Sequence, residues 1–233
     1  MTHAVTHGPG SVVGLVTIGQ SPRSDVVPDM AAVLGPGVEI REAGALDGLT
    51  HAEVEALAPS GDDEILVTRL RDGTPVFLGK PKIVRLVEER IAALERDGAS
   101  LTALLCTGAF PRLRATRPLI QPQPVLLGLL RGMSRPGRLG VLTPSLRHVR
   151  QTEARWRRDR FDAVVAPLSP YEEEDAAALR RAAAAMTGGG AGLIVMDCMG
   201  FRRKTRDELR ALTGVPVLLA NLLLARVIAE TCG

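Results

Sequence analysis

Two cysteines stand where a thiol could do chemistry. Cys106 and Cys198 each come at the end of a short apolar segment, and the motifs that they open, CTG and CMG, continue with small or flexible residues. Short apolar runs that end at turn residues are typical of buried strands. Because α/β proteins bind ligands at the carboxyl ends of parallel strands, each thiol is a candidate nucleophile or base.

The surroundings of the thiols predict proton transfer without a metal or cofactor. The backbone N–H groups of Thr107-Gly108 and Met199-Gly200, with the Thr107 hydroxyl, could cradle a carboxylate. We expect such electropositive surroundings to lower the thiol pKa. One thiolate would remove a proton beside the carboxylate, and the other thiol would return it to the opposite face. A lone cysteine is more often a small core residue, but two in matching positions favour this chemistry.

Further candidates for substrate binding lie after the first strand of each half. Gln20, Ser21 and Arg23 follow the first strand, and Thr143 holds the equivalent place in the second half. Arg23 suits a bidentate grip on a carboxylate, and an exposed arginine at a helix start is an equally good interpretation. Asp197 points away from its neighbour Cys198 along a strand, so we interpret it as a structural hydrogen-bonding residue.

Other motifs receive simpler interpretations. His148 keeps Cys–His hydrolysis open as a competing chemistry. Arg69 fits an exposed turn, Cys232 lies at the chain end and is interpreted as silent, and the run 155–158 (RWRR) fits a solvated helix face. The pattern of a phosphate-binding loop is absent from the sequence.

The segment 192–221 predicts how Cys198 is positioned. A strand at 193–197 precedes the cysteine, Thr205 and Glu208 form a capping box for a helix that Gly214 ends, and a second strand follows at 215–220. Asn221 can cap the last helix. A strand, a helix and a strand in so few residues predict a parallel pair with a right-handed crossover.

The rest of the chain alternates in the same way, which predicts an α/β fold with mainly parallel sheets. Expected strands lie at 12–18, 38–43, 65–70, 75–78, 101–105, 139–142 and 163–166, and expected helices at 23–34, 50–58, 81–98, 146–158 and 169–186. Asp72-Gly73 predicts a hairpin between the third and fourth strands. The segment 125–130 is a helix or a strand.

A weak internal repeat predicts two similar lobes. GLVTIGQSPR at 14–23 resembles GVLTPSLRH at 140–148, and LTALLCTG at 101–108 resembles LIVMDCMG at 193–200. We expect a first lobe at 1–120, a connection at 121–137, a second lobe at 138–220, and a last helix at 221–233 that packs back on the first lobe. The site would lie between the lobes.

Composition limits the partners. The net charge is 29 − 26 = +3 and aromatic residues make up 3%, so a base-stacking surface for nucleic acid is not expected. Three dispersed cysteines argue against a disulfide framework or a zinc site. The N-terminus does not resemble a signal peptide and the longest apolar run, 215–229, is too short to span a bilayer, so we expect a cytoplasmic location.

Several motifs together resemble the AroM family. These are VTIGQSPR near the start, RLRDG with the following VFLGK, and the late MDCMGF and VPVLLANLLLAR. That family is similar to the aspartate/glutamate racemase superfamily, so the resemblance implies two pseudo-symmetric lobes with a cysteine from each at an interlobe site. Cys106-Thr107-Gly108 and Cys198-Met199-Gly200 fall at the corresponding places.

We therefore expect a cofactor-independent racemase or epimerase of a small carboxylate or amino acid. Cys106 and Cys198 would be the acid/base pair, with the substrate-binding residues named above. A non-catalytic small-molecule binding protein on the same scaffold and a one-thiol isomerase or decarboxylase are the alternatives. Whether the chain forms a homodimer stays open.

Overall fold

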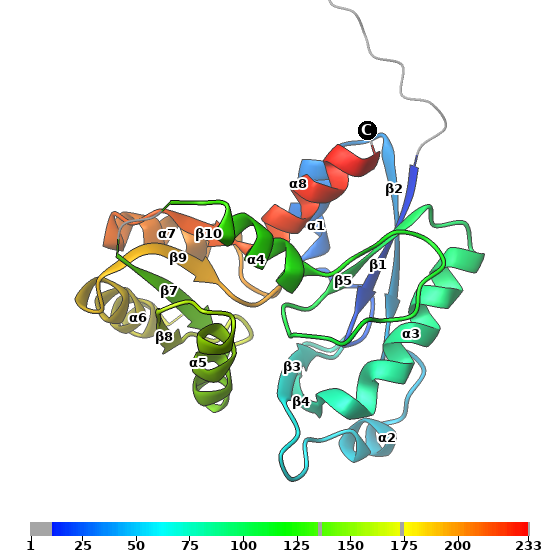
Figure 1. Ribbon diagram of the computed structural model, residues 1–233. Helices are drawn as coiled ribbons and strands as arrows, with labels where there is room; N and C mark the ends of the chain where they lie inside the picture. The colour runs from blue at the N-terminus through cyan, green and yellow to red at the C-terminus, as the bar shows by residue number, and fades with distance from the viewer. Residues whose placement is uncertain (1–10, 135–136, 173–174, 233) are drawn as a thin grey trace, which may run out of the picture.

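The computed structural model describes residues 11–134, 137–172 and 175–232. Two four-stranded sheets, each with parallel neighbours, form the two halves of the molecule (Figure 1). The first has the order β2 (Val38–Gly44), β1 (Ser11–Thr17), β5 (Leu101–Leu105), β6 (Leu119–Ile120). The second has the order β10 (Val217–Leu219), β9 (Ala191–Met196), β7 (Arg138–Thr143), β8 (Ala163–Pro167). The predicted α/β fold with two lobes is confirmed.

The two sheets have equivalent strand orders, as the internal repeat predicts. β1 and β7, which open the halves, lie beside β5 and β9, which precede the cysteines. Gly14 and Gly140 occupy the same place in the repeated motif, and a Cβ at either would lie within 3.0 Å of neighbouring side chains. Close packing against the strand therefore requires glycine at both positions.

Helices cover the sheets, and one hairpin extends from the first. The helices are α1 (Val27–Leu34), α2 (His51–Ala56), α3 (Lys80–Arg96), α4 (Pro122–Arg131), α5 (Val149–Arg158), α6 (Ala176–Gly188), α7 (Arg203–Thr213) and α8 (Ala220–Cys232). The predicted hairpin is confirmed, with β3 (Ile65–Arg69) antiparallel to β4 (Pro75–Gly79). Figure 1 shows it on the side of the first sheet that faces α5.

A single hydrophobic cluster extends through both halves. Side chains alternate along β1 and β7, so that Val13, Leu15, Leu139 and Val141 all enter this cluster. Two further clusters fill the opposite faces of the two sheets. The last helix, α8, packs against two earlier helices, α1 and α4. The shared core means that the halves do not have independent interiors.

The ends of the described chain lie together. Ser11 Oγ, at the start of β1, donates a hydrogen bond of 3.1 Å to the carbonyl of Cys232 at the end of α8.

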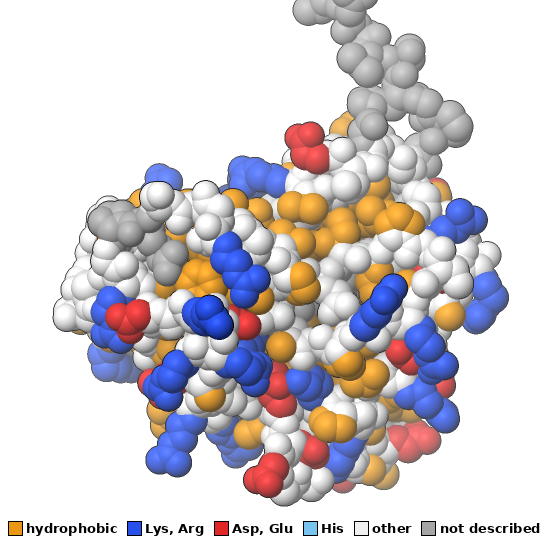
Figure 2. Space-filling view, viewed as in Figure 1, with side chains coloured by type: hydrophobic (Ala, Val, Ile, Leu, Met, Phe, Trp, Pro, Cys, Tyr) orange, Lys and Arg blue, Asp and Glu red, His pale blue; other side chains and the backbone are white. Residues whose placement is uncertain are grey.

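No helix in the described ranges is both long enough and apolar enough to cross a membrane. On the face seen in Figure 2, basic and acidic side chains are interspersed over both halves.

Several predicted helix starts are wrong. The helix expected at 23–34 begins at Val27, because the Arg23 carbonyl accepts the N–H groups of Val26 and Val27 in a turn. The helix expected from Ser169 begins at Ala176 and is capped by Asp175. The helix expected from Thr205 begins at Arg203.

Other local predictions are confirmed. Thr50 and Glu53 form both hydrogen bonds of a capping box, and Gly214 ends α7 with a left-handed φ of 68°. The segment 125–130, which the pattern left open, belongs to α4.

Candidate functional site

Both candidate thiols line one cavity between the lobes, which we call the thiol cavity. Cys106 follows β5, and Cys198 lies two residues after β9. The thiol cavity is partly open to solvent. Its empty space, including that open part, is about 480 Å³. Its walls come from both lobes: Ile18, Arg23, 64–68 and 105–108 of the first, and Thr143, Pro144, His148, Gln151, Thr152, Arg155, Tyr171 and 197–199 of the second.

Each thiol has a glycine N–H two residues later that favours its negative form. The Gly108 N–H donates to Cys106 Sγ over 3.4 Å, and the Gly200 N–H acts to lower the pKa of Cys198. A Cβ at Gly108 would lie 2.9 Å from a Leu66 methyl carbon, so only glycine fits there without displacement. The CxG pattern thus gives each sulfur one fixed donor to its negative form.

Loss of hydration nevertheless opposes ionisation of both thiols, of which Cys198 is buried and Cys106 is partly exposed. Loss of hydration raises the pKa of Cys106 to about 12, against the weaker effect of the Gly108 N–H. Burial also raises the pKa of Cys198, and the Tyr171 hydroxyl, the Gly200 N–H and the Arg23 charge act against it. The expectation that the surroundings lower both thiol pKa values is therefore wrong, because desolvation exceeds the few donors present.

Five of the predicted substrate-binding residues line the thiol cavity with the cysteines: Arg23, Thr107, Gly108, Thr143 and Met199. The two hydroxyls already have partners. Thr107 Oγ1 donates to the Asp197 carbonyl over 3.0 Å, and Thr143 Oγ1 lies 3.0 Å from Thr152 Oγ1. The Thr107 bond joins the loops that carry the two cysteines.

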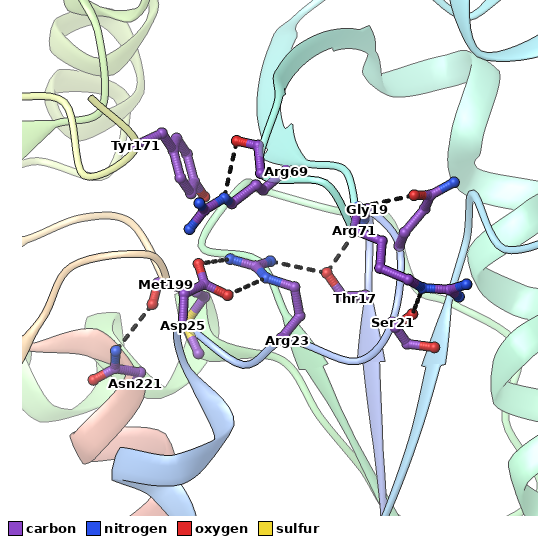
Figure 3. Close-up of polar contacts among 12 residues, drawn as sticks. Thr17, Gly19, Ser21, Arg23, Asp25, Arg69, Arg71, Tyr171, Met199 and Asn221 are labelled. Carbon is purple, nitrogen blue, oxygen red and sulfur yellow. Dashed lines mark hydrogen bonds and ion pairs between the residues drawn. The ribbon is translucent and has the colours of Figure 1, made fainter. Parts of the chain in front are cut away.

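Arg23 lies in the thiol cavity, but its guanidinium already binds a carboxylate of the chain. Its Nε and Nη2 bind the two Asp25 oxygens at 2.8 and 2.9 Å, and its Nη1 donates to Thr17 Oγ1 at 3.0 Å (Figure 3). The side chain is 3% exposed. A bidentate grip on a substrate carboxylate through this edge is therefore not available, because Asp25 occupies it.

The other predicted binding residues lie outside the thiol cavity. Gln20 Oε1 accepts the Arg71 N–H, and Ser21 Oγ donates to Asp47, so both support the loop after β1. Gly200 lines a neighbouring hollow of about 1160 Å³, which we call the outer pocket; its walls include Arg69, Leu168, Glu172, Phe201 and Arg202. Arg69, which fits an exposed turn in the sequence, therefore faces a pocket.

Sequence reasoning missed Tyr171 and the role of Arg155. The Tyr171 hydroxyl lies 3.5 Å from Cys198 Sγ. Arg155 binds the Asp197 carboxylate and donates to the Thr107 carbonyl at 2.9 Å, so it belongs to the site and not to a solvated helix face. The adjacent Trp156 is 1% exposed and donates from Nε1 to the same carboxylate at 3.1 Å. An apolar residue inside a run of arginines indicates that one face of this helix is buried, and Trp156 was therefore the signal in the sequence that could have placed Arg155 near the site. Asp197 has the structural role that the sequence favours.

Three buried polar atoms of residues that line the thiol cavity have no partner within the described residues: Thr68 Oγ1, His148 Nε2 and Asp197 Oδ1. The opposite ring nitrogen of His148, Nδ1, lies 2.8 Å from Ser145 Oγ. Burial and the charge of Arg155 lower the pKa of His148 to about 4, which keeps the ring neutral at pH 7. Buried polar groups normally have partners, so these three atoms keep unused hydrogen-bonding capacity beside the thiol cavity.

Comparison with known proteins places the chain in a family. The family model described as AroM protein matches residues 13–232. No curated protein matches the chain.

Solved structures with the same fold include racemases and an isomerase. Allantoin racemase from Pseudomonas fluorescens is 19% identical with a TM-score of 0.59, covering 94% of this chain and 89% of its own. Aspartate racemase from Picrophilus torridus is 12% identical with a TM-score of 0.63 and coverages of 96% and 95%. Maleate isomerase from Pseudomonas putida S16 is 14% identical with a TM-score of 0.62 and coverages of 95% and 92%. At these identities the likeness concerns the fold.

Proposed function

The chain belongs to the AroM family, and from this membership and the thiol cavity we propose that it is a racemase or epimerase of a small carboxylate or amino acid. One observation carries the proposal. Cys106 and Cys198, from equivalent positions of two lobes, line one cavity, and each has a glycine N–H on its sulfur. Names of proteins with the same fold, including racemases of aspartate and allantoin, agree with this reaction class.

The reaction needs one thiolate and one thiol. The thiolate takes the proton from the α-carbon, so that an S–H bond forms and the electron pair of the C–H bond moves into the carboxylate. The opposite thiol then gives its proton to the other face of that carbon, and its own electron pair stays on sulfur as a thiolate. The configuration is inverted, and the protons balance without an external oxidant or reductant.

The polar atoms without partners fit the substrate that this reaction requires. With the Ser145 hydroxyl donating to Nδ1, His148 Nε2 carries a hydrogen and can bind a carboxylate or enolate oxygen. Asp197 Oδ1 can accept a hydrogen from an amine or amide nitrogen. A small acid with a nitrogen on its α-carbon would satisfy both.

Deuterium exchange tests the proposal. The parent protein is incubated in D₂O with a panel of amino and hydroxy acids, and NMR follows loss of the α-proton while circular dichroism follows inversion. We expect Cys106→Ser and Cys198→Ser to lower inversion at least a hundredfold while ligand binding is retained, because each removes one proton carrier. Cys232→Ser is the matched control and should retain inversion. Inversion that survives in both single variants would rule the proposal out.

One observation favours a second candidate, a protein that binds a small acid without chemistry. Burial raises the pKa of both thiols, which leaves both protonated at neutral pH. The same panel separates the two, because a binding protein would show calorimetric binding and no exchange even in the parent. A one-thiol isomerase or decarboxylase would instead change the product and tolerate loss of one of the two cysteines.

A further inference from the structure

Tyr171, the single tyrosine of the chain, stands beside one thiol. Its hydroxyl lies 3.5 Å from Cys198 Sγ, and its side chain lines both the thiol cavity and the outer pocket. It follows β8 in the second lobe and extends toward Arg69 and Arg23 of the first lobe (Figure 3). The ring therefore forms the wall between the thiol cavity and the outer pocket.

The loop after Cys198 is shaped to admit this ring. A Cβ at Gly200 would lie 2.6 Å from Tyr171 Cε1 and 2.8 Å from its hydroxyl oxygen. A Cβ atom does not approach non-bonded atoms this closely, so any other residue at position 200 would displace the ring. Gly200 thus supplies the N–H that faces Cys198 and also leaves the space from which Tyr171 reaches the same sulfur.

The hydroxyl can act only as a donor to a negative sulfur. Burial and the nearby Cys198 raise the pKa of Tyr171 well above its ordinary value, so the hydroxyl keeps its proton. A charge-assisted bond from a hydroxyl stabilises a thiolate and not a thiol. The other ionisable groups around Cys198 are Arg23, with its partner Asp25, together with Asp197 and Cys106.

Cys106 has no side-chain hydroxyl donor among the residues that the structure describes. The donor that faces Cys106 Sγ among the described residues is the Gly108 N–H. Among the side-chain hydrogen-bond donors, the Tyr171 hydroxyl is therefore what distinguishes Cys198 from Cys106.

We propose that Tyr171 is a catalytic residue whose hydroxyl hydrogen-bonds to Cys198 Sγ, so that Cys198 loses its proton to water first and Cys106 retains its own. Cys198 is then the thiolate that attacks and Cys106 the thiol that returns the proton. The identity of the reacting sulfur rests on the proposed function, whereas the hydrogen bond does not, and the tests below need no substrate.

Alkylation of single-thiol proteins tests the assignment. Cys106→Ser with Cys232→Ser leaves Cys198 as the one thiol, and Cys198→Ser with Cys232→Ser leaves Cys106 as the matched control. The rate of reaction with iodoacetamide is measured against pH in each, with and without Tyr171→Phe. We expect Tyr171→Phe to move the Cys198 midpoint about one pH unit upward, which slows alkylation about tenfold below that midpoint, and to leave the Cys106 midpoint in place. Equal shifts at both thiols, or no shift at Cys198, would overturn the proposal.

A second measurement uses the unmodified ring. Because the chain has one tyrosine, ¹³Cζ labelling gives one resonance. We expect this resonance to titrate with the pH midpoint of Cys198 alkylation, to keep that titration in Cys106→Ser, and to lose it in Cys198→Ser. A resonance that does not respond to Cys198 would overturn the proposal even if Tyr171→Phe failed to fold. The proposed reaction would then still stand or fall on deuterium exchange.

Discussion

At the two thiols, burial and hydrogen bonding act on the same atom in opposite directions. Burial is the larger effect at both, and the donors decide how much the two differ. Cys198 has a glycine N–H, a tyrosine hydroxyl and the charge of Arg23, whereas Cys106 has the glycine N–H of its own CxG motif and the charge of Arg155. An acid/base pair needs this kind of difference, because one group must start with the proton and the other without it.

The raised pKa of Cys106 predicts how stability depends on pH. A thiol in the unfolded chain has a pKa of about 8.5, whereas burial raises that of Cys106 to about 12 in the folded protein. The folded state therefore binds the proton more tightly, and this contribution is complete below the unfolded pKa and is lost as pH rises toward the folded one. We expect the free energy of unfolding of the parent to fall by up to about 1.4 kcal/mol per pH unit in that window, relative to Cys106→Ser.

Urea unfolding of both proteins on either side of pH ~8.5 measures this difference. Parallel pH profiles would show that Cys106 ionises as easily in the folded protein as in the unfolded chain.

Residue identity alone predicted the position of the thiols but not their surroundings. A cysteine after an apolar strand and before a glycine can be found in the sequence, because these are local features. The contacts of Tyr171 and Arg155 depend on the other lobe or on a loop far along the chain, so no local spacing marks them. Arg23 was predicted to reach the site and does so, but its partner Asp25 belongs to a turn that the sequence assigned to a helix.

At the scale of elements, α8 positions the loop that carries Cys198. Asn221, predicted to cap this helix, lies inside it, and its Nδ2 donates to the carbonyls of Met199 and Phe201 at 2.9 and 2.8 Å. The residue is 1% exposed. A helix that packs on the first lobe therefore holds the backbone just after the thiol of the second.

Removal of this amide should disturb the site through the loop. We expect Asn221→Ala to lower the free energy of unfolding by about 1–3 kcal/mol, because two buried carbonyls lose their donor, and to change the alkylation rate of Cys198. Thr231→Ala, on the exposed end of the same helix, is the matched control and should change stability by less than about 0.5 kcal/mol. Equal effects of the two variants, measured by urea unfolding, would exclude this role for Asn221.

Two of the wrong helix starts, at Ser169 and Thr205, share a physical cause. Capping boxes predict a start where only local hydrogen bonds compete, as at Thr50. After Ser169 the chain first carries Tyr171 to Cys198, so the helix starts only at Ala176. Before Thr205 the Phe201 carbonyl is held by Asn221, and the helix follows directly at Arg203. Tertiary contacts at the site override local signals in both cases.

At the scale of the whole molecule, the hairpin β3–β4 bridges to the second lobe. The side-chain amide of Gln151 on α5 pairs with the backbone of Ile65, donating to its carbonyl at 2.6 Å and accepting its N–H at 3.0 Å. Both residues line the thiol cavity. This pair of bonds joins the two lobes at the wall of the cavity that Cys106 also lines.

Loss of the pair should open the cavity more often. We expect Gln151→Ala to raise the alkylation rate of Cys106 about tenfold, which corresponds to roughly 1.4 kcal/mol for two hydrogen bonds. Gln123→Ala serves as the matched control. It removes a single side-chain hydrogen bond between Gln123 and Asp159, and neither of these residues lines the thiol cavity. An unchanged rate in Gln151→Ala would show that this contact does not limit access.

The sequence repeat predicted the two-lobed arrangement because both halves repeat the same local order of strands. It did not predict that they share a hydrophobic cluster, since the partners of Leu15 and Val141 across that cluster lie far apart in the chain.

The bond between Ser11 and the last residue of α8 has a topological consequence. The described part of the chain, residues 11–232, almost closes into a ring. A circular permutant that joins position 232 to position 11 through a short linker, and opens between α4 and β7, would retain every strand pairing. In such a permutant the two lobes would form one closed circuit of chain, with Cys106 and Cys198 in the cavity between them.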